Sequence, residues 1–264
     1  MTSPILVTGG TGTLGRHVVR RLHEAGRDVR VLTRHAHDAS EGVEYVVGDL
    51  MQDKGIDAAV DGAGVIVHCA GSQKGDEVAT ANLVRAASAA GKPHLVYISV
   101  IGADRIPVVS GVDRMMFSYF ASKRAAELVV SGSGLPWTTL RAAQFYELML
   151  KVTEAMAKLP VIPVPKGMRF QPVDSDEVAE RLVELALDSP AGLVPDMAGP
   201  RIYSTAELMR EYLAARRLKR RMVPVPIPGQ AAGAVRAGAN IDPDRAVGRR
   251  TWEDFLADRV LSAA

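Results

Sequence analysis

The sequence has little of several features that mark specialised proteins. Its 264 residues include one cysteine, Cys69, so no disulfide can form within the chain, as is typical of a reducing compartment. No apolar run reaches the roughly 18 residues that a membrane span needs. The net charge of +2 is too small to indicate a nucleic acid or an acidic partner. The chain opens on an apolar strand pattern at 5–7 with no charged leader. We therefore expect a cytoplasmic protein without membrane or nucleic-acid partners.

Two other patterns exclude further functions. His35 and His37 lie two residues apart, without the cysteines or carboxylates that complete a metal site, so no metal is expected. A basic run at 216–221 follows a predicted helix, where cations offset the helix dipole. We interpret this run as a solvated face. The aromatic content of 5% makes the few aromatic residues near a predicted cleft more informative.

Up to about residue 143, short β-branched runs alternate with longer amphipathic segments. This alternation is typical of a parallel sheet covered by helices on both faces. The predicted strands lie at 5–8, 29–32, 44–47, 65–68, 95–99 and 138–140. The predicted helices lie at 14–25, 77–90, 117–130 and 146–158, and Gly26 is a suitable left-handed cap for the first of them.

After residue 143 the pattern becomes less regular. Prolines interrupt the segments at 160–165 and 224–228, and two helices are marked by capping-box spacing, Asp174 with Glu177 and Ser204 with Glu207. We predict an α/β fold, a doubly wound parallel sheet of the Rossmann type with a small C-terminal substrate-side lobe. Residues 1–143 form its dinucleotide-binding core. Residues 144–264 complete the core and form the lobe.

The clearest motif follows the first strand. Residues 8–15 read Thr-Gly-Gly-Thr-Gly-Thr-Leu-Gly, which contains the G-x-G-x-x-G spacing. The spacing alone is weak, but here a buried strand precedes it and an amphipathic helix follows. Glycines then let backbone N–H groups approach a pyrophosphate at the positive end of the helix. A turn that merely needs glycine is the alternative. The predicted phosphate loop consists of Gly9, Gly10, Thr11, Gly12, Thr13, Leu14 and Gly15.

The end of the second strand indicates which dinucleotide binds. An NAD site usually has a carboxylate there for the ribose 2′-hydroxyl, whereas this strand ends in Thr33-Arg34 and has no acid before Asp38. Arg34 can make a bidentate contact with a 2′-phosphate, and Arg16 is a candidate second contact. Ordinary solvated arginines are the alternative. The sequence predicts NADP (NADPH) as the cofactor.

Two further turns are candidates for cofactor contacts. Asp49 and Leu50 follow the third strand, where an aspartate could accept a hydrogen bond from the adenine amino group. Cys69, Ala70 and Gly71 follow the fourth strand, where small residues let the cofactor ribose pass close to the backbone. A polar turn and tight packing are the respective alternatives.

Together these motifs resemble the short-chain dehydrogenase/reductase superfamily, and more closely its atypical NmrA-like branch. That branch includes NADP-dependent quinone and ketone reductases, phenylpropanoid-type reductases and cofactor-binding redox sensors. The resemblance extends over nearly the whole chain. It is carried by ILVTGGTGTLGRHVV at 5–19, VRVLTR at 29–34, GDL at 48–50, YISVIGAD at 97–104, YFASKRAAE at 119–127, GLPWTTLRAAQFYE at 134–147 and FQPVDSDEVAERL at 170–182.

The resemblance implies catalytic roles for Tyr119 and Lys123, which form Y-x-x-x-K and lie one helical turn apart. The tyrosine would protonate the carbonyl oxygen as hydride arrives, and the lysine would hold the nicotinamide ribose and lower the tyrosine pKa. A positive charge about 4 Å away contributes at most about 4 kcal/mol, enough to bring the phenol near neutral pH. Ser99 is a candidate carbonyl donor, although Val100 follows it where related enzymes often have a second hydroxyl. A helix tyrosine with a solvated lysine, and a plain strand-end serine, are the alternatives.

The sequence thus predicts an NADP-dependent reductase that transfers hydride to a carbonyl or quinone-type small molecule, as a monomer or homodimer. A non-catalytic NADP(H)-binding redox sensor and an epimerase or dehydratase of the same superfamily remain open. Phe145 and Phe170 could equally be core residues. The candidate substrate-side residues follow the sixth strand or belong to the later lobe, and are Gln144, Phe145, Tyr146, Phe170 and Gln171.

Overall fold

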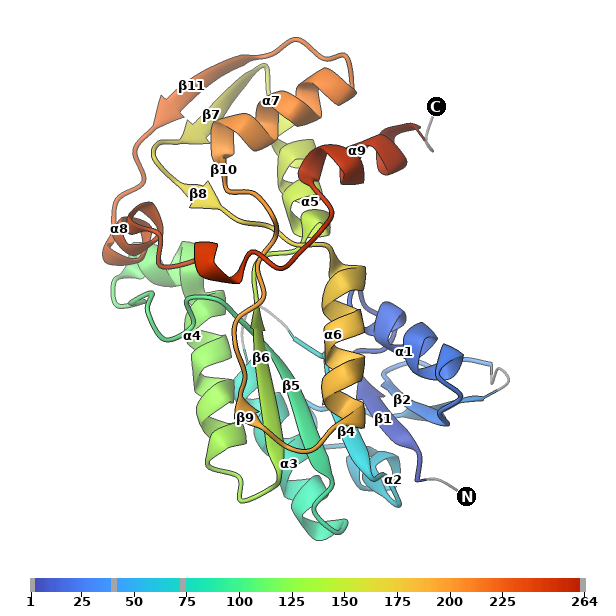
Figure 1. Cartoon of the computed structure of the whole chain (residues 1–264). Coiled ribbons are helices and arrows are strands. Elements are labelled where there is room, and N and C mark those ends of the chain that lie inside the picture. The colour runs from blue at the N-terminus through green and yellow to red at the C-terminus, as the bar shows by residue number, and fades with distance from the viewer. Residues whose placement is uncertain (1–2, 39–41, 72–74, 262–264) are drawn as a thin grey trace. The chain divides into compact units, whose positions relative to one another are not determined.

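The computed structural model describes residues 3–38, 42–71 and 75–261 (Figure 1). The chain divides into two compact units that interleave along the sequence. Unit 1 comprises Met1–Ser99, Tyr119–Arg141 and Asp176–Pro195, and unit 2 comprises Val100–Ser118, Ala142–Ser175 and Asp196–Ala264. Part of the later half therefore clusters with the early strands. The proposed division at 143/144 stays a prediction.

Unit 1 is built on a seven-stranded parallel sheet in the order β3-β2-β1-β4-β5-β6-β9 (Figure 1). The predicted doubly wound parallel sheet is confirmed. The chain winds outward in one direction from β1 and in the other from β4, so the topological switch point lies between these two strands. The strands are β1 (Ile5–Thr8), β2 (Val29–Thr33), β3 (Val43–Val47), β4 (Val65–His68), β5 (His94–Val100), β6 (Trp137–Ala142) and β9 (Gly192–Leu193).

Successive side chains of each strand point to opposite faces of the sheet, so the strands contribute to packing on both faces. One layer contains Leu6 and Ile66 from the sheet together with Leu83 and Ala126 from the helices that cover this face. On α1, Arg20 and Arg21 both pair with Asp176 of α6, so these two helices lie side by side. The helices are α1 (Gly15–Glu24), α2 (Ile56–Val60), α3 (Asp76–Ala89), α4 (Gly111–Ser131) and α6 (Ser175–Leu187).

Unit 2 has its own aromatic core. The rings of Tyr146, Trp252 and Phe255 lie 5.3–5.8 Å apart and are almost completely buried. Two small sheets complete the unit, antiparallel β8·β10 and parallel β7·β11. Its elements are α5 (Tyr146–Ala157), β7 (Val161–Pro165), β8 (Arg169–Phe170), β10 (Tyr203–Ser204), α7 (Thr205–Ala215), β11 (Arg221–Val225), α8 (Gln230–Ala237), the 3₁₀ turn Pro243–Arg245 and α9 (Trp252–Leu261).

Helix ends follow local capping chemistry. The predicted capping box of α7 is present, because the Ser204 hydroxyl accepts from the Glu207 N–H while the Glu207 carboxylate accepts from the Ser204 N–H. Gly26 has a φ of 69°, as expected after α1. Helix α4 begins six residues before the predicted start at 117, since Ser110 and Asp113 form a reciprocal cap of the same kind.

Candidate functional site

The glycines of the 8–15 loop occupy their positions for different physical reasons. Gly9 has a φ of 67°, and a Cβ there would lie 2.7 Å from the backbone nitrogen of Ala70. A Cβ on Gly15 would lie 2.1 Å from the Gly9 carbonyl oxygen. Gly9 is therefore needed to bring the turns after β1 and β4 together at the switch point, and Gly15 is needed to pack the start of α1 against the loop itself. Gly12 is exposed, and a Cβ there would meet only the Gly9 oxygen, at 3.2 Å.

The loop leads directly into an uncompensated helix N-terminus. Helix α1 begins at Gly15, without a side-chain cap and without an acidic residue in its first turn. Free N–H groups and the helix dipole favour an anion at such an end. The open face of Gly12 and this N-terminus together fit the diphosphate of a dinucleotide.

Arg34 lies where β2 ends, and its side chain is exposed. Within the described ranges, neither Arg34 nor Arg16 pairs with a carboxylate, whereas Arg30 of the same strand is bound to Glu44 at 2.7 Å. Because an arginine in this position has no carboxylate partner, it can bind a phosphate without first breaking an ion pair. The residues therefore fit the ribose 2′-phosphate of NADP.

Asp49 organises its own turn. Its Oδ1 accepts hydrogen bonds from the N–H groups of Met51 at 2.7 Å and Gln52 at 3.2 Å. This is the polar turn that we considered as the alternative to adenine binding. Leu50 is buried in the core of unit 1. An adenine contact for either residue stays a prediction.

The turn after β4 connects the loop to the candidate catalytic lysine. A Cβ on Gly71 would lie 3.1 Å from Lys123 Nζ and 3.4 Å from Asp76 Oδ2. Burial raises the pKa of the Cys69 thiol to about 12, against the opposing charge of Lys123. The thiol therefore stays protonated, which argues against a nucleophilic role. Small residues at 69–71 leave space for the lysine.

Lys123 is held in a fixed position inside unit 1. Its ammonium group lies 3.1 Å from Asp76 Oδ2, and both side chains are 4% exposed. It also donates to the carbonyl oxygen of Ile98 at 3.2 Å. The ring centroids of Tyr97 and Tyr119 lie 5.0 and 5.8 Å away. The sequence reasoning identified Lys123 and Tyr119 but missed Asp76, whose only local signal was its place at the start of a predicted helix.

Lys123 lowers the pKa of Tyr119 as expected, but the expected net result, a phenol that titrates near neutral pH, is wrong. Burial raises the pKa of the Tyr119 phenol, Lys123 lowers it, and the charge of Asp76 raises it again, so that the pKa lies above its usual value. The sequence indicates the lysine charge but neither the desolvation of the phenol nor the opposing carboxylate. Burial also opposes the charge of Lys123, but the two phenols and Asp76 outweigh it and raise the lysine pKa.

A buried chain of hydrogen bonds joins the phosphate loop to Asp76. Thr80 Oγ1 donates to the Asp76 carbonyl at 2.6 Å and lies 3.1 Å from His68 Nε2, so it must accept a hydrogen bond from the N–H at that position. His68 Nδ1 is then an acceptor, and Thr8 Oγ1 donates to it at 2.6 Å. Thr8 in turn accepts from the Ala70 N–H. The donor and the acceptor of every hydrogen bond in this series are thus fixed.

Helix α4, which carries Tyr119 and Lys123, is fixed to β6 by a second buried ion pair. Arg141 donates two hydrogen bonds to Glu127, at 2.7 and 2.8 Å. Burial raises the pKa of Glu127, but the hydrogen bonds and charge of Arg141 lower it. Ser99 and Arg124 lower it further, so that the pKa lies below its usual value. Ser99, at the end of β5, is also buried. A bidentate pair of this kind fixes the rotation of the helix and hence the direction in which Lys123 points.

The candidate substrate-side residues belong to unit 2 and differ among themselves. Tyr146 is a core residue whose hydroxyl donates to the Arg250 carbonyl, and Phe170 packs against the same core. Gln171 donates to Gly199 and accepts from Asp242. These three have packing or structural roles, so we do not carry them into the proposed substrate site.

Gln144 differs from its neighbours. It is 8% exposed, and neither atom of its amide has a hydrogen-bond partner among the described residues. A buried amide without partners costs about 1–3 kcal/mol unless a ligand or water satisfies it. Phe145 is half-buried beside it. Both stay candidates for substrate contact.

Comparison with known proteins decides the family. A profile described as NAD(P)H-binding matches residues 9–189. The chain belongs to this NAD(P)H-binding family. Ceramide reductase of Caulobacter vibrioides is 31% identical over 258 residues, which cover 90% of this chain and 77% of the relative. NAD(P)H azoreductase of Xenophilus azovorans is 30% identical over 219 residues, covering 80% and 73%.

The fold agrees with solved structures of NAD(P)H-dependent proteins. The NADPH-dependent quinone oxidoreductase QOR2 of Escherichia coli, solved with NADPH, has a TM-score of 0.80 at 17% identity over 97% of this chain and 99% of that one. At this identity the likeness concerns the fold. NAD(P)H as the cofactor and the class of NAD(P)H-dependent oxidoreductase are confirmed for this member of the family.

None of the helices described is long and apolar enough to span a membrane. Across 3–38, 42–71 and 75–261, no group of three or more histidine, cysteine or acidic side chains could hold a metal ion.

Proposed function

We propose that this NAD(P)H-binding protein is an NADPH-dependent reductase of quinones and related small molecules that accept hydride readily. The observation that carries the proposal is the position of Lys123, buried between the Gly71 turn and the Tyr119 ring and paired with Asp76. The phosphate loop would hold the diphosphate, Arg34 the 2′-phosphate, and Lys123 the ribose next to the nicotinamide. NADPH supplies the hydride when bound.

The role of Tyr119 follows from its protonation state. Because its pKa is raised, the phenol is protonated at neutral pH and can donate a proton to a substrate oxygen. Hydride addition to carbon and this proton together convert a carbonyl to an alcohol. The phenolate left behind is stabilised by Lys123 and regains its proton from water. Asp76 opposes this stabilisation, which makes Tyr119 a weak acid.

A weak acid favours one class of substrate over another. An unactivated ketone develops a strongly basic oxygen as hydride arrives, so its reduction depends on proton donation. A quinone forms a stabilised hydroquinone anion and depends on it less. We therefore place quinones before simple ketones. The two relatives above are a ceramide reductase and an NAD(P)H azoreductase. A long-chain lipid and an azo dye should therefore be tested beside the quinones.

The test is NADPH oxidation at 340 nm with quinones, an azo dye, a long-chain lipid, aromatic aldehydes and cyclic ketones. We expect the quinones to react fastest. Tyr119→Phe should lower turnover of an aldehyde by about 10²–10⁴ and that of a quinone much less, with NADPH affinity unchanged. Tyr45→Phe, on β3, is the matched control. Tight NADPH binding without reduction of any compound would contradict the reductase proposal and favour the redox sensor.

A further inference from the structure

In unit 2 the positive charge of the chain is concentrated in two neighbouring segments. Residues 151–166 and 212–225 contain eight lysines and arginines and one acid, Glu154, although the whole chain has a net charge of +2. The remaining residues are therefore net negative. The two segments meet because β7 and β11 pair in parallel, with Arg221 opposite Val161 and Val223 opposite Pro163. Charge of one sign is thus gathered on one part of unit 2.

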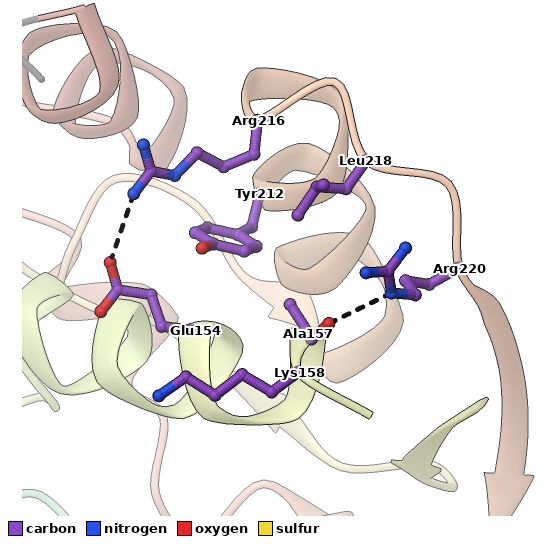
Figure 2. Close-up of a pocket in the computed structure, with 7 residues that line it drawn as sticks. All are labelled: Glu154, Ala157, Lys158, Tyr212, Arg216, Leu218 and Arg220. Atoms are coloured by element: carbon purple, nitrogen blue, oxygen red, sulfur yellow. Dashed lines mark hydrogen bonds and ion pairs between the residues drawn. The ribbon is translucent and has the colours of Figure 1, made fainter. Parts of the chain in front are cut away.

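These segments enclose a shallow pocket of about 360 Å³ between the ends of α5 and α7. Figure 2 shows Lys158, Arg216 and Arg220 around the ring of Tyr212. Arg216 lies 3.9 Å from Glu154, and Arg220 donates to the Ala157 carbonyl at 3.2 Å. Two of the three pocket cations therefore have protein partners, which orient them at the rim.

The cations next to the pocket have fewer interactions with the rest of the protein. Arg217, Lys219 and Arg221 are exposed, and none of them pairs with a carboxylate within the described part of the chain. Arg217 also has a φ of 53°, a conformation that usually belongs to glycine at the end of a helix. This chain thus has a cation at a position where glycine would be less strained.

Apolar side chains lie among these cations. Leu159, Val161, Leu218 and Val223 are 37–45% exposed. In the β7·β11 pair, Val161 and Val223 are on the solvent face, while Ile162 and Val164 are buried. We call the end of α5, the turn at 216–220 and this solvent face the α5–β11 surface. It combines exposed aliphatic groups with unpaired positive charge.

We propose that the α5–β11 surface docks on a bilayer that contains anionic phospholipids. Cations near such a bilayer are attracted by its negative surface potential, and aliphatic side chains between them can enter the region of the headgroups. The pocket at Tyr212 offers a phosphate group three cations at its rim. Docking here revises the expectation that the protein has no membrane partner.

The mixture of side chains distinguishes a bilayer from other anionic partners. A nucleic acid would bind the cations through its phosphates. It would offer no apolar phase that the aliphatic side chains could enter. An acidic protein segment would leave most of the aliphatic face uncovered. A bilayer satisfies both kinds of group, since its phosphates lie beside its acyl chains.

The experiment is sedimentation of the full chain with vesicles of phosphatidylcholine alone and with about one quarter phosphatidylglycerol. We expect binding to the anionic vesicles and loss of binding in high salt. Arg217→Gly should weaken it by about fivefold, since each cation contributes about that factor. This variant relieves the left-handed backbone, so unfolding cannot explain the loss. Adding Lys219→Ala and Arg221→Ala should bring the loss to about 100-fold.

Lys92→Gly is the matched control, because Lys92 is also an exposed cation, with a φ of 57°, and belongs to unit 1. It should bind vesicles like the unaltered chain, and all variants should retain NADPH affinity, which keeps this test separate from the reductase proposal. Equal binding of the triple variant and the unaltered chain would overturn the proposal. So would equal binding to both vesicle types, or a DNA duplex that binds more tightly than the anionic vesicles.

Discussion

In the proposed function, single residues set the choice of cofactor and the acidity of the site. Arg34 is exposed and has no acid partner in the described part of the chain, whereas Asp76 is buried against Lys123. We propose that the first acts on a ligand from solution and the second on the charge of another side chain. Each role gives its own prediction.

Arg34→Ala should weaken NADPH binding by at least about tenfold and leave NADH binding unchanged, because only NADPH carries the 2′-phosphate that the guanidinium would bind. Calorimetric titration with both cofactors measures the difference. Arg27→Ala is the control, since Arg27 precedes the same strand at its other end. A parallel loss for both cofactors would refute a specific phosphate contact.

Asp76→Asn should shift the pH profile of carbonyl reduction. The Asp76 charge raises the pKa of Tyr119, so its removal lowers that pKa and moves the alkaline fall of kcat to lower pH. Glu77→Gln neutralises the adjacent carboxylate and should leave the profile in place. An unchanged profile for Asp76→Asn would show that Tyr119 does not govern the alkaline limb.

At the scale of elements, different glycines of the loop between β1 and α1 serve packing and ligand binding. Gly9 and Gly15 are required by close backbone contacts within the unit, whereas Gly12 is exposed and an added Cβ there would meet only the Gly9 oxygen, at 3.2 Å. A larger residue at the first two positions would disturb the fold. The same change at Gly12 would disturb only what binds there.

Gly12→Val should therefore reduce NADPH affinity by about tenfold or more, since its side chain would enter the space that the diphosphate needs. The thermal midpoint should move little. Gly111→Val is the control, because an added Cβ at Gly111 meets no other atom within 4 Å and lies outside the loop. Fluorescence titration of NADPH, with circular dichroism for the fold, measures both effects. Normal NADPH binding by folded Gly12→Val would remove the loop from the phosphate site.

The elements were largely predictable because their signals are local. Strand periodicity located β1 to β6, and the Ser204–Glu207 spacing located α7. Short α2 has too few residues for a periodic pattern, and the start of α4 depends on a Ser–Asp cap that we did not recognise. The Asp76–Lys123 pair was beyond prediction, since it joins two helices through the fold. Desolvation of Tyr119 was missed for the same reason.

At the scale of the whole molecule, the buried polar chain through His68 makes stability depend on pH. Burial and the Lys123 charge lower the pKa of His68 from 6.5 to about 3, against the effect of Asp76. Between these values the unfolded chain binds a proton that the folded protein excludes. The free energy of unfolding should therefore fall as pH falls, by up to about 1.4 kcal/mol per unit.

Urea unfolding at pH 7, 6, 5 and 4 measures this slope. His68→Gln can keep a hydrogen bond to Thr80 but cannot titrate, so its stability should be lower at pH 7 and should change less between pH 6 and 4. His35→Gln, exposed on the loop after β2, is the control. The same slope in His68→Gln and the unaltered chain would assign the acid sensitivity to other groups.

The interleaving of the two units has a consequence for synthesis. Because unit 1 takes its last segment from Asp176–Pro195, helix α6 and strand β9 leave the ribosome well after β1 to β6. At about 5–20 residues per second, the nascent sheet waits several seconds with its β6 edge uncovered. During that interval it is open to pairing with other chains. Slow codons placed between residues 142 and 175 would lengthen the wait and should increase aggregation during expression.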